Sequence, residues 1–103
     1  MINLDLSGKR ALVTGASLGI GEAVVKLLAD HGADVSFCAR NEAGVAALSG
    51  YQTEGGGKVT GFISDMEDAA STEAFLIAAT ASGDIDILIN NVGASPSRNF
   101  LYM

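Results

Sequence analysis

The segment Val13-Thr14-Gly15-Ala16-Ser17-Leu18-Gly19-Ile20-Gly21 joins an apolar run to a stretch with helical spacing, and it decides how the chain folds. The residues before it, from Arg10 onward, end in an apolar run that suits a buried strand. Its glycines permit a tight turn and a close approach of the backbone to a ligand, because a Cβ atom would block both. The first N–H groups of the following helix point at such a ligand, and the helix dipole favours negative charge there. The segment therefore predicts a phosphate-binding turn between a strand and a helix.

The spacing of these glycines narrows the kind of nucleotide that the turn would hold. Gly15, Gly19 and Gly21 follow the pattern Gly-x-x-x-Gly-x-Gly. This differs from the Gly-x-x-x-x-Gly-Lys-Ser/Thr loop that binds nucleoside triphosphates, and also from the general Gly-x-Gly-x-x-Gly dinucleotide pattern. The spacing argues against a kinase-like protein. The hydroxyls of Thr14 and Ser17 could either bond a phosphate or fix the turn.

Apolar and helical stretches alternate along the rest of the chain. The helix after the turn is expected to bury its periodic apolar residues and to end at Gly32; these residues are Ile20, Ala23, Val24, Leu27 and Leu28. Further strands are predicted over 34–39, 58–64 and 85–90. Asn41 is expected to cap one intervening helix, and Asp68 or Ser71 the other. The glycines 55–57 are interpreted as a surface linker.

This alternation predicts the α/β class with a parallel sheet and helices on both faces. We expect residues 1–103 to form a single, partial Rossmann-like domain with strand order 3-2-1-4. In that order the glycine turn and the segment 90–93 emerge together at the crevice between the first and fourth strands, where ligands bind in such folds.

Composition and charge exclude several classes of protein. With 49% hydrophobic and 17% charged residues the chain is globular, and its formal net charge of −6 argues against nucleic acid or an anionic membrane as a partner. The sequence contains neither an apolar run of membrane-spanning length nor a signal-peptide pattern at its start, so a cytoplasmic protein is the simplest expectation. The single cysteine, Cys38, lies in an apolar run and predicts a buried side chain, with neither a disulfide nor a metal site.

Together with Asn90-Asn91-Val92-Gly93, the pattern from Thr14 to Gly21 resembles the short-chain dehydrogenase/reductase family, over a region from about Gly8 to the last residue. The resemblance implies hydride transfer between a nicotinamide dinucleotide and a small alcohol or carbonyl substrate. The residues that it places at the cofactor are Gly15, Ser17, Leu18, Gly19, Ile20, Gly21, Arg40, Asp65, Met66, Asn91, Val92 and Gly93.

Arg40, directly after the second predicted strand, favours NADP(H) over NAD(H). An acidic residue at this place would bond the ribose 2′-hydroxyl, whereas a guanidinium can bind a 2′-phosphate with charge-assisted hydrogen bonds. The NADP-preferring members of the family often carry a second basic residue before the middle glycine, where this chain has Leu18. As an alternative, Arg40 is simply a solvated charge at the end of a strand.

The resemblance also assigns roles beyond the phosphates. Asp65 and Met66 would contact the adenine, although Asp65 could equally be an acidic residue that leads into a helix. The family's Asn-Asn-Ala-Gly motif, here 90–93 with Val92 in the alanine position, would brace the sheet and line the cofactor cleft. Asn90 could be purely structural.

The catalytic residues of the family have no counterpart in the chain. Its members use a tyrosine as general acid and base, with a lysine four residues later that lowers the tyrosine pKa. Neither Tyr51 nor Tyr102 has a lysine at that spacing. We therefore expect the chain to be the cofactor-binding half of such an oxidoreductase and inactive alone. The alternatives are a non-catalytic dinucleotide-binding or regulatory module, and a folded remnant with neither role.

The predicted strand 85–90 would be a long apolar edge without a neighbour. Such an edge favours pairing between copies, so we expect a homo-oligomer.

Overall fold

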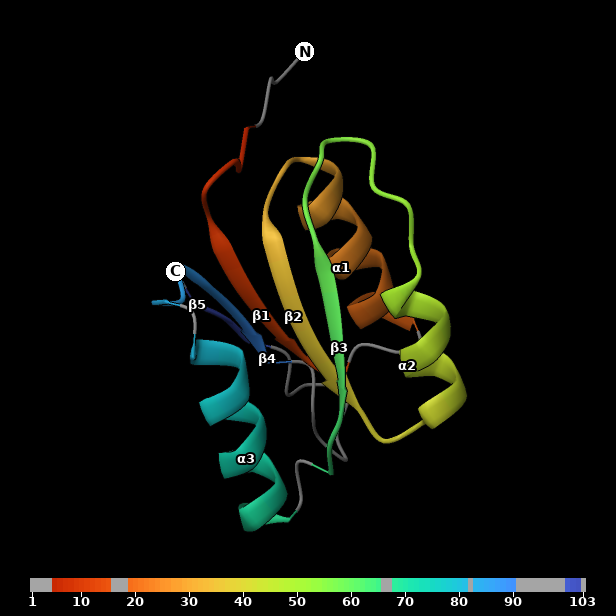
Figure 1. The fold of residues 1–103 in the computed structure, drawn as a ribbon, viewed down its shortest axis with the longest axis vertical. Coiled ribbons are helices and arrows are strands. Elements are labelled where there is room, and N and C mark those ends of the chain that lie inside the picture. The colour runs from red at the N-terminus through yellow and green to blue at the C-terminus, as the bar shows by residue number, and fades with distance from the viewer. Residues whose placement is uncertain (1–4, 16–18, 66–67, 82, 91–99, 103) are drawn as a thin grey trace.

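The computed structural model describes residues 5–15, 19–65, 68–81, 83–90 and 100–102, which form a single sheet with helices on both faces (Figure 1). The strands are β1 (Arg10–Thr14), β2 (Asp34–Ala39), β3 (Val59–Ile63), β4 (Ile87–Asn90) and β5 (Phe100–Tyr102). The helices are α1 (Gly19–Asp30), α2 (Glu42–Ser49) and α3 (Ala69–Thr80). The strand order is β3-β2-β1-β4-β5, and β1 to β4 pair in parallel. The α/β class and the 3-2-1-4 order are thus confirmed.

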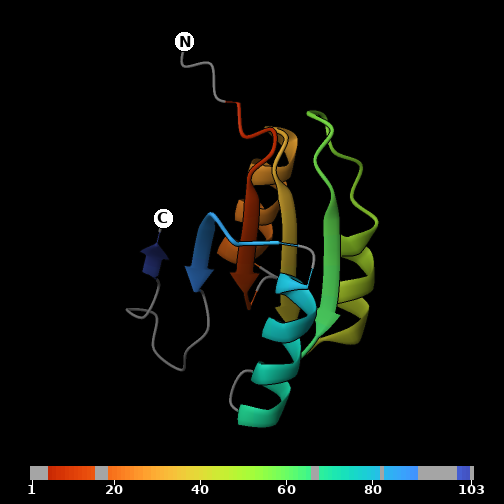
Figure 2. The ribbon, with the colours of Figure 1, turned by 60° about the vertical axis from the view of Figure 1, so that its left-hand side comes forward.

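The two faces of the sheet carry separate cores. Helices α1 and α2 cover one face, and α3 crosses the other, as Figure 2 shows. Successive side chains of β1 point to opposite faces of the sheet. Ala11 and Val13 pack under α1 and α2, whereas Leu12 packs under α3. On the α3 face the rings of Phe62 and Phe75 meet edge to face, with centroids 5.4 Å apart.

The prediction that strand 85–90 lacks a neighbour is wrong. In the described part of the chain β5 pairs antiparallel with β4, with Ile89 opposite Leu101. The strand begins at Ile87, later than predicted. Directly before it, the Arg10 backbone N–H donates to the Asp86 carboxylate (2.9 Å), and the Asp86 N–H donates to the Arg10 carbonyl (2.8 Å). Self-pairing of a bare β4 edge is therefore not a basis for oligomerisation.

Helix α1 has the predicted length but buries a different face. The residues turned to the sheet are Gly21, Val25, Leu28 and Ala29. Ile20 and Leu27, expected in the core, are 64% and 54% exposed. Gly21 has no side chain and Ala29 has only a methyl group, so the helix can approach the sheet closely; larger side chains at these places would prevent this. Glu22 and Lys26, four residues apart on this helix, form an ion pair with a distance of 2.9 Å between Oε1 and Nζ.

The ends of the other helices follow the expected cap residues in part. The side chain of Asn41 accepts the Gly44 N–H (2.9 Å) and so caps α2, as predicted. Asp68 occupies the N-cap position of α3, but its side chain makes no capping hydrogen bond. Gly32 ends the turn after α1 with φ +102°, a conformation that favours glycine.

Gly55 and Gly56 are exposed, as the interpretation of 55–57 as a surface linker predicts, but that interpretation is wrong for Gly57. Gly57 is buried against α1, where its N–H donates to the Ala29 carbonyl (3.3 Å). A Cβ atom at Gly55 would overlap the Asp30 carbonyl, and one at Gly57 would overlap the carbonyls of Ala29 and Ala33. Gly55 and Gly57 are therefore required for close packing of this loop on the end of α1.

Asp30 holds the same loop by its carboxylate. Its Oδ2 accepts the Tyr51 hydroxyl (2.7 Å), and its Oδ1 accepts the Glu54 N–H (3.0 Å). The Glu54 N–H first, and then the Tyr51 hydroxyl, hold the pKa of Asp30 below its ordinary value of 3.8. The folded state is therefore more stable when Asp30 is ionised than when Asp30 is protonated.

We expect this loop to add stability that depends on pH. Because the folded-state pKa of Asp30 is depressed, its contribution is complete above pH 3.8 and is lost as the pH falls through the folded-state value. Urea unfolding of the wild-type chain and of Asp30→Asn should differ most near neutral pH and converge in acid. The difference should be modest, because the carboxylate is partly exposed. A difference in unfolding free energy between wild type and Asp30→Asn that stays constant with pH would contradict this role of the Asp30 carboxylate.

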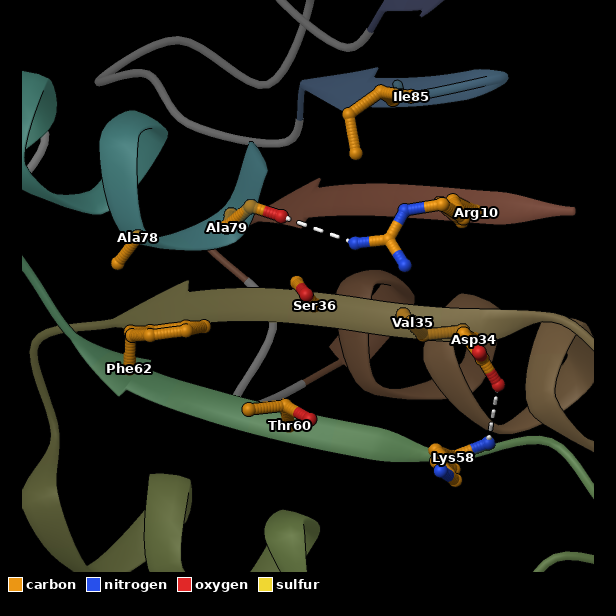
Figure 3. Close-up of a pocket in the computed structure, with 11 residues that line it drawn as sticks. Arg10, Asp34, Val35, Ser36, Lys58, Thr60, Phe62, Ala78, Ala79 and Ile85 are labelled. Atoms are coloured by element: carbon orange, nitrogen blue, oxygen red, sulfur yellow. Dashed lines mark hydrogen bonds between the residues drawn. The ribbon is translucent and has the colours of Figure 1, made fainter. Parts of the chain in front are cut away.

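A cavity of about 320 Å³ lies on the α3 face at the amino ends of β1 to β3 (Figure 3). The Arg10 guanidinium points into it and donates to the Ala79 carbonyl (3.4 Å) in the last turn of α3, where a cation suits the helix dipole. The Lys58 N–H donates to the Asp34 carboxylate (3.3 Å) on the opposite wall. The cavity thus lies at the edge of the sheet away from the glycine turn.

None of the helices in the described residues is long and apolar enough to span a membrane.

Candidate cofactor site

The carboxyl ends of the parallel strands meet at one edge of the sheet. Thr14 lies in register with Cys38 on one side and with Asn90 on the other, and Ala39 lies in register with Ile63. The segments that leave this edge are Gly15 after β1, Arg40 after β2 and Ser64–Asp65 after β3. Three of the predicted binding positions, distant in sequence, therefore share one edge.

The glycine turn has the backbone that its sequence predicts at both described ends. Gly15 and Gly19 have φ values of +67° and +65°, in the left-handed region that favours glycine. A Cβ atom at Gly19 would meet nothing within 4 Å, so conformation rather than crowding within the chain requires glycine there. Gly21 is buried in α1, and Ile20 is exposed beside it. Ser17 and Leu18 lie outside the described residues.

Thr14 and Asn90 join β1 to β4 at the crevice. The Thr14 hydroxyl, on a residue only 3% exposed, donates to the Asn90 side-chain oxygen (2.8 Å). The structure thus gives the Thr14 hydroxyl a partner on β4, directly before the turn. The sequence motifs include both residues, but their contact could not be predicted from the motifs because it depends on the β1–β4 register. Asn91, Val92 and Gly93 lie outside the described residues.

Cys38 is buried beneath the first glycine of the turn, as predicted. Burial raises the pKa of its thiol, and a hydrogen bond from the Gly15 backbone opposes this shift. A buried, protonated thiol is chemically inert. Cys38 therefore acts as a packing residue at this edge.

Arg40 follows β2 directly and is exposed, next to the cap residue Asn41 of α2. Its neighbour Ala39 is 6% exposed, so the chain passes from core to solvent within one residue. An exposed guanidinium at this edge is available to an anionic ligand, although the chain carries a net charge of −6.

Asp65 follows β3 and is half-buried. Its N–H donates to the Ser71 hydroxyl (3.0 Å), and Ser71 also contacts the Ser64 hydroxyl (2.8 Å). The sequence indicated Ser71 only as a possible helix cap; these contacts require the placement of α3 over the end of β3. Met66 lies outside the described residues.

Neither the position nor the pKa of Tyr51 suits acid–base catalysis at this edge. It contacts Asp30 at the far end of α1, and that carboxylate raises the tyrosine pKa. The Lys26 ammonium lies over the ring, 5.2 Å from its centroid. A general-acid tyrosine needs the opposite shift. The described residues hold no cluster of three or more His, Cys, Asp or Glu side chains that could bind a metal.

A sheet of parallel strands with a glycine turn at its central crevice and a cation after the second strand is typical of dinucleotide-binding α/β proteins. The chain belongs to the short-chain dehydrogenase/reductase family, since the family model for short chain dehydrogenase matches residues 9–103. It corresponds to the N-terminal, cofactor-binding portion of these oxidoreductases.

Similar proteins include the 3-oxoacyl-(acyl-carrier-protein) reductase FabG of Vibrio harveyi, 46% identical over 101 residues, which cover 97% of this chain and 40% of the relative. A chloroplastic tropinone reductase homolog of Arabidopsis thaliana is 39% identical, over 88% of this chain and 29% of its own length. The chain thus spans about 40% or less of these relatives.

Solved structures agree with the fold. A short-chain dehydrogenase/reductase from Serratia marcescens has a TM-score of 0.79 at 41% identity, over 86% of this chain and 37% of that structure. The Pseudomonas aeruginosa RhlG/NADP active-site complex has a TM-score of 0.75 at 34% identity, over 91% of this chain and 38% of its own.

Proposed function

We propose that the chain binds NADP(H) at the carboxyl edge of β1 to β4, as the cofactor half of an oxidoreductase that transfers hydride between nicotinamide and a small alcohol or carbonyl compound. The observation that carries the proposal is the convergence of the glycine turn, Arg40 and Asp65 at one edge of the sheet. Family membership and a relative solved with NADP support it.

In this proposal each segment of the edge binds one part of the cofactor. The turn of Gly15, Ser17, Leu18, Gly19, Ile20 and Gly21 holds the pyrophosphate at the start of α1. The Arg40 guanidinium binds the ribose 2′-phosphate. Asp65 and Met66 contact the adenine, and Asn91, Val92 and Gly93 line the cleft.

The chain supplies binding and orientation, whereas the cofactor supplies the hydride. Lacking a Tyr-x-x-x-Lys sequence, residues 1–103 are proposed to bind cofactor without turning over substrate. The proposal places this oxidoreductase in the cytoplasm. Association of copies remains part of the proposal, through exposed apolar side chains such as Leu27 and Ile77 rather than through β4.

Titration of the chain with NADPH and NADH tests the cofactor assignment. We expect tighter binding of NADPH, and Arg40→Ala should weaken it by roughly 10- to 100-fold, the worth of a charge-assisted hydrogen bond. NADH binding should change little, because it lacks the 2′-phosphate. Lys58→Ala is the matched control, since it removes an exposed cation at the amino ends of the strands.

The outcomes separate the alternatives. Equal affinity for NADPH and NADH would overturn the NADP(H) preference but leave a dinucleotide site. Binding of neither would favour the folded remnant over both the enzyme half and the binding module.

A further inference from the structure

Two serines fasten the end of β3 to the first turn of α3. Ser64 is 4% exposed, and its hydroxyl lies 3.2 Å from the Ser71 carbonyl and 2.8 Å from the Ser71 hydroxyl. Ser71 Oγ also accepts the Asp65 N–H (3.0 Å). Ser71 thus reaches back across six residues to the main chain of Asp65.

The three contacts fit one arrangement of protons. The Asp65 N–H donates to Ser71 Oγ, the Ser71 hydroxyl donates to Ser64 Oγ, and the Ser64 hydroxyl donates to the Ser71 carbonyl. Each hydroxyl then donates once and accepts once. A set of connected hydrogen bonds at a largely buried position holds its members in one geometry.

The set also connects Asp65 to β2. The Ser64 N–H donates to the Ala39 carbonyl (3.0 Å), and Ala39 directly precedes Arg40. Farther along, the Asp68 N–H donates to the Asp65 carbonyl (3.0 Å). The main chain of Asp65 is therefore held on both sides, by the strand edge and by the start of α3.

We propose that Ser71 is a positioning residue of the cofactor site, which fixes the main chain of Asp65 so that its carboxylate meets the adenine. This inference rests on the proposed function. It assigns to α3 a part in binding that the sequence motifs do not contain, because Ser71 lies outside every motif of the cofactor edge.

Binding of two fragments tests the inference. In Ser71→Ala the affinity for adenosine 2′,5′-bisphosphate should fall roughly 3- to 10-fold, the range of one hydrogen bond. Binding of inorganic pyrophosphate, which has no adenine, should not change. Ser71→Thr keeps the hydroxyl and should restore the affinity. Ser49→Ala is the matched control, since its hydroxyl bonds only a carbonyl within α2 (2.7 Å).

A double-mutant cycle shows whether Ser71 acts through Asp65. In an Asp65→Ala background Ser71→Ala should cause no further loss of adenosine 2′,5′-bisphosphate affinity. Equal losses in both backgrounds would overturn the inference, as would unchanged affinity in Ser71→Ala.

Hydrogen exchange of the Asp65 amide gives a readout without ligand. Ser71→Ala should speed this exchange, and unchanged exchange would overturn the positioning role even if nucleotide binding failed. If the wild-type chain bound no nucleotide while the amide responded, the proposed function would fail, and the contacts of Ser71 with Ser64 and Asp65 would be structural only.

Discussion

Gly57→Ala is expected to destabilise the chain by about 3 kcal/mol, the upper part of the range for overpacking. The new methyl group would overlap the carbonyl oxygens of Ala29 and Ala33. These are backbone atoms of α1 and of the turn before β2, and they cannot rotate away as a side chain would. The loop would have to leave α1, with loss of the Gly57 hydrogen bond to Ala29.

Gly56→Ala is the matched control for this prediction. Gly56 has φ +84° and nothing lies within 4 Å of a Cβ atom there, so alanine should cost only about 1 kcal/mol through backbone conformation. Urea unfolding of the two variants at one pH gives the comparison. A Gly57→Ala midpoint at or above that of Gly56→Ala would restore the interpretation of these glycines as a surface linker.

The glycine loop illustrates what the sequence could and could not predict about the fold. The alternation of strands and helices, together with the strand order known for Rossmann-like sheets, predicted the order 3-2-1-4 that the structure has. The packing of residues 55–57 was not predictable, because a run of glycines is typical both of a flexible linker and of close contact between backbones. Only the placement of α1 distinguishes these.

Helix α1 and strand β5 show two further reasons why the sequence-based prediction differs from the structure. Spacing predicted an amphipathic α1, but not that Gly21 and Ala29 rather than Ile20 and Leu27 face the sheet, since steric fit outweighs side-chain hydrophobicity at a close contact. The pairing of β5 with β4 is a long-range contact of a three-residue strand, too short to carry a periodic signal.

At the candidate site the sequence predicted positions better than contacts. Gly15, Arg40 and Asp65 could be assigned to one edge because each follows a predicted strand. The bond between Thr14 and Asn90 depends on strand register, and the Ser71 contacts depend on where α3 begins. Neither property is contained in a local motif.

Phe37→Ala is expected to destabilise the chain by about 4 kcal/mol, because a fully buried aromatic ring leaves a cavity that its neighbours fill only in part. This is a large share of the 5–15 kcal/mol that typically stabilises a domain. Phe37 lies on β2, two residues before Ala39, and packs with Val45 and Leu48 of α2. Its loss should loosen the strand end that carries Arg40.

The ring of Phe37 also explains why its register partner on β3 is Gly61. A Cβ atom at Gly61 would overlap the Ser49 hydroxyl and would lie 2.7 Å from Phe37 Cζ and 2.9 Å from Val45 Cγ1. The Ser49 hydroxyl is at the end of an exposed side chain and can rotate, whereas the ring is fully buried. We therefore expect Gly61→Ala to destabilise the wild-type chain but to cost less in a Phe37→Leu background, whose shorter side chain removes one of the close contacts.

Phe75→Leu supplies the control background, since Phe75 is equally buried but lies on α3, across the sheet from the Gly61 Cβ position. The effects of Gly61→Ala and Phe75→Leu should add, whereas those of Gly61→Ala and Phe37→Leu should not. Additivity in both pairs, measured by urea unfolding, would mean that the ring and the glycine are not coupled. The position of Arg40 would then depend on β2 pairing rather than on this packing against α2.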